Sequence, residues 1–83
     1  MITADQIRAA RARVKWSAQD LADKTSLGLS TIQRMEKAEG VPSSSGKNLA
    51  DVQDALEAAG VIFIPGNGEG PGVRLRKTGK PEL

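Results

Sequence analysis

Two short helical segments separated by only three residues constrain the fold more than any other feature of this chain. Ser17 and Asp20 have the spacing of a capping box, in which two side chains satisfy free amides at the start of a helix, and this predicts a helix over residues 18–25. Gly28 tolerates either hand of backbone and completes a tight connection, after which a second helix is predicted over residues 29–37. Two helices this short need other elements to pack against.

Two further helices are predicted around this pair. Thr3 and Gln6 form another capping box, followed by apolar residues at helical spacing, so a helix is expected over residues 4–15. A fourth helix is expected over residues 45–59, with Gly60 at its end.

Trp16 precedes the cap of the second helix, where a hydrophobic residue can pack back onto the helix as a staple. We expect it to pack on Leu21. An exposed aromatic platform for nucleic-acid bases is the alternative interpretation.

The last part of the chain changes from helical to strand periodicity. "VIFI" reads as one strand, "PGNGEGPG" as a glycine-rich connection and "VRLR" as a second strand, so a β-hairpin is predicted. Both faces of the first strand are apolar, and the chain's own helices can cover one of them. We expect the other face to meet a second subunit, so the strand formed by Val61, Ile62, Phe63 and Ile64 is predicted to be the dimerisation element; a helical domain folding around both faces is the alternative.

The predicted fold is therefore mainly α, with four helices and a C-terminal β-hairpin. Three regions are expected: a helical domain over residues 1–60, the hairpin over 61–76, and a basic flexible tail over 77–83. Arg76 at the end of the hairpin and Lys77 and Lys80 in the tail are expected to be solvated, with phosphate or minor-groove contact as the alternative.

Composition excludes several classes of protein. The chain has no Cys and no His, so zinc fingers, disulfide frameworks and His-based catalysis are excluded, and we expect neither an enzyme nor a metal or other cofactor. Its longest apolar run has four residues, far fewer than the roughly 20 of a membrane span. We expect a cytoplasmic protein without a membrane segment and without a small-molecule effector.

Charge is unevenly distributed along the chain. Residues 1–16 carry +3, residues 17–70 carry −4 and residues 71–83 carry +3, which sums to the net charge of +2. Two basic ends flanking an acidic middle suit a polyanionic partner that is held at defined places.

The predicted helix over residues 29–37 has a polar side and an apolar side. At 100° per residue, Ile32, Met35 and Glu36 share one side, while Ser30, Gln33 and Arg34 project away from it, with Lys37 beside them. No carboxylate lies three or four residues from Arg34, so its guanidinium is free to bind a partner. Arginine can bridge guanine O6 and N7, and glutamine can pair with adenine. An ordinary solvated helix face is the alternative.

Arg11 and Glu36 are each expected on the apolar side of their helices. Two opposite charges that face one core must pair or pay a large desolvation penalty, so we predict an ion pair between them. Loss of either partner should cost roughly 3–5 kcal/mol.

Residues 4–59 resemble the phage-repressor and Cro-like helix-turn-helix domains, also called the xenobiotic-response-element type, which have the lambda-repressor-like fold. The resemblance rests on "WSAQDLADKTSLGLSTIQRMEKAEGVP" and "NLADVQDAL". It implies binding to double-stranded DNA, with the helix over 29–37 in the major groove. The implied base contacts are Leu29, Ser30, Gln33 and Arg34. The family's paired helix 1 arginine and helix 3 acid fall on Arg11 and Glu36.

The same resemblance places the phosphate contacts around the edges of the groove. They are Ser17, Ala18, Thr31, Lys37, Ser43, Ser44 and Lys47. This chain departs from the family at Ala18, where a glutamine is common and touches DNA; here the glutamine is the next residue, Gln19.

The function expected from the sequence is that of a dimeric transcription repressor bound to a palindromic operator. Dimerisation through the hairpin would place two copies of the helix over 29–37 about one DNA turn, roughly 34 Å, apart. The alternative is a protein-interaction module, such as an antitoxin or anti-activator of a mobile element, that uses the exposed strand.

Overall fold

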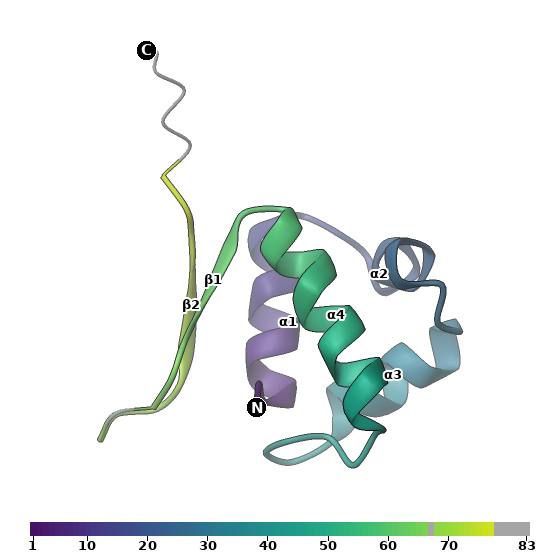
Figure 1. Cartoon of the computed structure of the whole chain (residues 1–83), viewed down its shortest axis with the longest axis horizontal. Coiled ribbons are helices and arrows are strands. Elements are labelled where there is room, and N and C mark those ends of the chain that lie inside the picture. Colours follow the sequence, from purple (N-terminus) through teal and green to yellow (C-terminus); the bar gives the residue numbers. More distant parts are fainter. Residues whose placement is uncertain (67, 78–83) are drawn as a thin grey trace.

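The computed structural model describes residues 1–66 and 68–77. Four helices are followed by two strands (Figure 1): α1 Ala4–Arg13, α2 Ala18–Thr25, α3 Leu29–Lys37, α4 Gly46–Ala58, β1 Val61–Ile64 and β2 Gly72–Leu75. The predicted fold class, four helices with a C-terminal hairpin, is confirmed. The predicted tail lies outside the described residues except for Lys77, so Lys80 has no structural account here.

Both predicted capping boxes are present. Gln6 N–H donates to Thr3 Oγ1 and Thr3 N–H donates to Gln6 Oε1 at the start of α1, and the same exchange joins Ser17 and Asp20 at the start of α2. α1 ends two residues earlier than predicted, because Lys15 adopts a left-handed backbone with φ of 62°.

The turn between α2 and α3 has the predicted three residues. The left-handed backbone conformation lies at Ser26, with φ of 62°, whereas Gly28 has an ordinary φ of −71° and serves as the N-cap of α3. A left-handed residue directly after a helix is a common way to end it, and here a serine fills that position. Thr25 Oγ1 supports the turn by donating to Leu21 O at 2.8 Å.

The core lies between the four helices and the hairpin. Its largest fully buried side chains come from all four helices and from β1: Ile7, Leu21, Ile32, Leu49, Val52, Leu56 and Val61. Trp16 is partly buried and packs against this core, as expected for a staple, and Lys24 Nζ lies 5.5 Å from the centre of its ring.

The hairpin packs beside α1 and α4, on the side of the molecule away from α2 and α3 (Figure 1). Its strands are antiparallel, with Val61 opposite Leu75 and Ile64 opposite Gly72. The second strand begins one residue earlier than predicted.

Gln6 joins the hairpin to α1. Its side chain is buried, and Nε2 donates to Ile64 O at 3.1 Å and to Gly72 O at 3.0 Å, while Oε1 remains in the capping box. The amide therefore satisfies carbonyl groups on both strands at the loop end of the hairpin. One side chain both starts α1 and fixes the hairpin on it.

The structure corrects the proposed dimerisation residues. Val61 is only 1% exposed and Phe63 packs against the core, so these two side chains belong to the protomer interior. Ile62 and Ile64 alternate with them on the other face of β1 and are partly buried. The more exposed strand is β2, where Leu75 is 39% exposed.

Candidate nucleic-acid interface

Helix α3 has one buried side and one exposed side. Its inner side buries Ile32, Met35 and Glu36, as the helical projection predicted. The exposed side chains on the opposite side are Ser30, Gln33, Arg34 and Lys37. We call these four residues the outward face of α3.

This face carries unpaired positive charge. In residues 1–66 and 68–77, the ion pairs are Arg8 with Asp5, Arg11 with Glu36, and Lys47 with Asp51. Arg34 therefore keeps a free charge, and its Nη2 lies 3.5 Å from the hydroxyl of Thr31. The first turn of α3 holds no acidic residue, so nothing on the helix opposes an approaching anion there.

The start of α3 also offers backbone donors. Gly28, its N-cap, has no side chain to accept from the first amides, and the first amide bonded inside the helix is that of Thr31, which donates to Gly28 O at 3.0 Å. The amides of Leu29 and Ser30 are therefore left for solvent or a ligand.

A bidentate ion pair between Arg11 and Glu36 fixes α3 against α1. Arg11 Nε lies 2.8 Å from Glu36 Oε2 and Nη2 lies 2.9 Å from Glu36 Oε1, while Nη1 donates to Trp16 O at 3.0 Å. Donation of these hydrogen bonds to the Glu36 carboxylate raises the pKa of the Arg11 guanidinium. The pair thus holds the outward face of α3 at a fixed angle to the rest of the domain.

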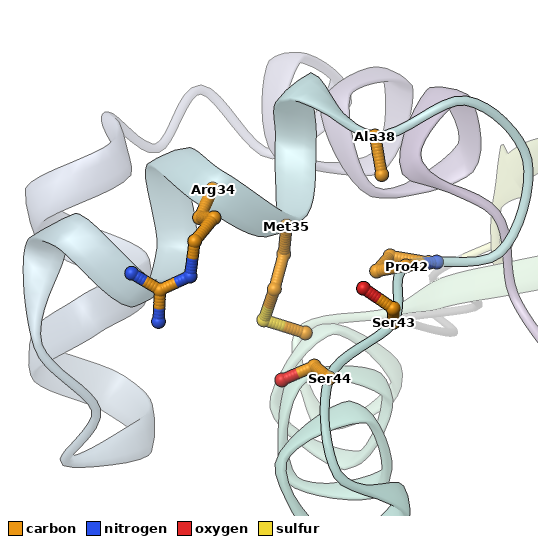
Figure 2. A pocket seen from close by; sticks show the side chains of 6 residues that line it. All are labelled: Arg34, Met35, Ala38, Pro42, Ser43 and Ser44. Atoms are coloured by element: carbon orange, nitrogen blue, oxygen red, sulfur yellow. The ribbon is translucent and has the colours of Figure 1, made fainter.

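One hollow borders the outward face on the side of the loop that leads to α4. It has a volume of about 120 Å³ and is lined by Arg34, Met35, Ala38, Pro42, Ser43 and Ser44. Figure 2 shows Met35 extending toward Ser44, while the guanidinium of Arg34 lies back along α3, where its Nη2 is near the Thr31 hydroxyl. We call it the loop-side hollow.

A second hollow borders the outward face on the other side, between α3 and the first two helices. It is lined by Arg8, Arg11, Ala18, Gln33, Glu36 and Lys37. We call it the α1-side hollow. The outward face of α3 is thus a ridge between two recesses, of which the loop-side hollow has Arg34 as its basic residue and the α1-side hollow has three basic residues.

A family model described as helix-turn-helix matches residues 7–45, which include most of α1 and all of α2 and α3. Residues 7–45 are a helix-turn-helix domain of the Cro/C1 type. No curated protein matches the chain. The matched domain belongs to a non-enzymatic family, and the match implies that residues 7–45 bind DNA.

Most of the proposed contact residues of the helix-turn-helix domain lie on one surface around the ridge. Ser17, Lys37, Ser43 and Lys47 are exposed, and Ala18, Thr31 and Ser44 are partly buried. Lys47 Nζ lies 2.9 Å from Asp51 Oδ2, so part of its charge is neutralised within α4. Leu29 is partly buried and packs against the core, which leaves only part of its side chain to reach DNA.

Sequence reasoning did not single out Arg8. Its guanidinium donates from Nη2 to Asp5 Oδ1 and from Nη1 to the carbonyl of Glu36, at the end of α3. The spacing of Asp5 and Arg8 indicates a local ion pair, but the carbonyl partner lies 28 residues away in the chain.

Neither a membrane-spanning helix nor a metal-binding cluster is present among the described residues. No helix among them is long and apolar enough to cross a membrane. Nor does this part of the chain bring together three or more acidic residues in a way that would hold a metal ion.

Proposed function

We propose that this chain is a transcription repressor that binds a two-fold symmetric operator as a homodimer, with α3 in the major groove of each half-site. The observation that supports the proposal is the outward face of α3. It projects from the domain, carries unpaired charge and is presented at an angle fixed by the Arg11–Glu36 pair.

Within the groove, Arg34 and Gln33 have the chemistry for direct base recognition. The Arg34 guanidinium suits O6 and N7 of guanine, and the Gln33 amide suits N6 and N7 of adenine. Ser30 offers a hydroxyl near the start of the helix. The exposed part of Leu29 supplies an apolar contact for a thymine methyl group.

Phosphate groups would be held along both borders of the groove. The start of α2 offers the Ser17 hydroxyl and the free amide of Ala18, and the loop-side hollow offers the hydroxyls of Ser43 and Ser44. Thr31, Lys37 and Lys47 complete this set. These contacts set the register of the protein on DNA without reading bases.

Dimerisation is assigned to the hairpin. Its position on the side of the domain away from α2 and α3 leaves the DNA-facing elements free when two hairpins meet (Figure 1). Ile62 and Ile64 provide apolar surface on the face that turns away from the core, and the exposed β2 provides a strand edge. With no effector site proposed, the concentration of the dimer would set occupancy of the operator.

In vitro selection from a pool of random DNA duplexes, combined with light scattering of the protein, tests this function. We expect the selected sequences to share an inverted repeat whose half-sites are about one turn apart, and the protein to have twice the mass of one chain. Selection of single, asymmetric sites by a protein that stays monomeric on DNA would contradict the dimeric assignment. A pool that yields no enriched sequence would contradict specific recognition altogether.

One observation favours a second function, that of a protein-interaction module. β2 exposes Leu75 between the basic residues Arg74 and Arg76, and a free strand edge of this kind can pair with a strand of another protein. A chain that is monomeric by light scattering would leave this edge free and would favour that function.

A further inference from the structure

The α1-side hollow gathers basic side chains from two helices. It is an open recess of about 450 Å³ between α1, the start of α2 and the side of α3 that carries Gln33. Arg8 reaches it from α1 and Lys37 from the last turn of α3. It lies directly beside the outward face of α3. Lys37 and the amide of Ala18 are among the phosphate contacts proposed above, but Arg8 has no role in them.

The charges around the recess leave a net positive site. Arg11 and Glu36 also line it, but each oxygen of the Glu36 carboxylate already accepts from Arg11, so this pair is internally neutral. Lys37 is exposed and has no acidic partner among the described residues. Arg8 shares its charge with one carboxylate, that of the exposed Asp5.

The guanidinium of Arg8 is held in place by two hydrogen bonds and still has free N–H donors. Nη2 donates to Asp5 and Nη1 donates to the carbonyl of Glu36, which leaves three of the five N–H groups of the guanidinium available. Being held at two points reduces the side-chain entropy that binding a ligand would otherwise cost. An oxyanion in the recess would therefore meet an arginine that is already oriented.

Neutral donors complete the recess. The Gln33 side chain lines it beside Lys37. Ala18 lines it at the first position of α2, where the backbone amide precedes both the capping bond from Asp20 N–H to Ser17 Oγ and the first backbone bond of the helix, from Leu21 N–H to Ser17 O. Two cations, an amide side chain and a free backbone amide are the groups that bind a phosphate.

We propose that the α1-side hollow seats one phosphate group of the DNA backbone, that Arg8 and Lys37 are its two charged ligands, and that Asp5 weakens this site by sharing the charge of Arg8. The proposal rests on the proposed function, since it uses the same DNA-facing surface. Arg8 projects from α1 and not from α3, so its contact is independent of base sequence.

The test is a salt titration of binding to a random-sequence duplex, followed by fluorescence anisotropy. We expect Arg8→Ala to reduce the slope of log affinity against log salt by about 0.9, the value for one lost phosphate contact, and to weaken binding about tenfold at 0.1 M salt. Asp5→Asn should strengthen binding severalfold, because it frees the charge of Arg8. The double variant should bind like Arg8→Ala, since Asp5 acts through Arg8.

Arg13→Ala is the matched control, because Arg13 is an exposed arginine of the same helix that does not line the recess. It should leave the slope unchanged. Arg8→Lys, which keeps the charge, should retain the wild-type slope and guards against a folding defect in Arg8→Ala.

The outcomes separate this proposal from the function on which it rests. A wild-type slope in Arg8→Ala, or a loss of slope as large in Arg13→Ala, would overturn the phosphate seat while leaving DNA binding by α3 intact. A wild-type protein that binds no duplex at low salt would instead contradict the proposed function.

Discussion

Replacement of Arg11 with alanine should lower the free energy of unfolding by about 4 kcal/mol, because it leaves the Glu36 carboxylate buried without its partner. The Glu36 side chain is only 9% exposed, and both of its oxygens accept from Arg11. Glu36→Ala should cost less, about 3 kcal/mol, because the Arg11 side chain is 25% exposed and keeps its bond to Trp16 O. Urea unfolding, followed by the fluorescence of the single tryptophan, measures both changes.

Two controls make this prediction specific to the ion pair. Arg13→Ala removes an exposed arginine of α1 and should change stability by no more than about 0.5 kcal/mol. The double variant Arg11→Met with Glu36→Leu removes both charges and should be more stable than either single variant, since no unpaired charge remains in the interior. Single variants as stable as Arg13→Ala would show that the pair does not hold α3 in place.

The second large effect is expected on DNA affinity when Arg34 is replaced. Arg34→Ala should weaken binding to the sequence selected by the wild-type protein by about 10- to 100-fold, because a bidentate contact to guanine supplies roughly 1–3 kcal/mol of discrimination. Binding to a random duplex should weaken much less, since there Arg34 contributes only its charge. Parallel titrations of both duplexes by fluorescence anisotropy measure the ratio of the two affinities.

Lys37→Ala is the comparison for Arg34→Ala, because both residues are exposed and unpaired on the same helix. If Lys37 contacts a phosphate, Lys37→Ala should weaken binding to the two duplexes by the same factor. Arg34→Lys should keep nonspecific binding but recover little of the specificity, since an ammonium group cannot bridge two acceptors as a guanidinium does. Equal losses for both duplexes in Arg34→Ala would make Arg34 a phosphate contact.

The parts of the site that depend on local periodicity were predictable from the sequence. The split of α3 into a buried side with Ile32 and Met35 and an exposed side with Arg34 follows from 100° per residue alone. Arg11 and Glu36 are 25 residues apart in the sequence, yet their pairing was predictable. Each charge faces the core from its own helix, and each is the opposite charge that the other needs there.

The features that were missed depend on how distant segments pack. Gln6 was predicted only as a cap, because the two hairpin carbonyls it binds lie 58 and 66 residues further along the chain. Val61 was assigned to an interface, although the side of a strand that faces the core is set by the packing of the hairpin on α1 and α4. The left-handed conformation of Ser26 was not predicted, because serine has no preference for it and the sequence pointed only to the freedom of Gly28.

The central claim is that DNA meets the outward face of α3, and the chain offers a competing basic surface on which to test it. Arg74, Arg76 and Lys77 are exposed on the hairpin, at the other side of the domain. NMR spectra of the 15N-labelled protein, recorded during titration with a short DNA duplex, distinguish the two surfaces residue by residue. The largest shifts are expected on Ser30 to Lys37, including the Nε–H signal of Arg34. If the largest shifts fell on residues 74–77 while α3 stayed unchanged, DNA would bind the hairpin side and not the outward face of α3.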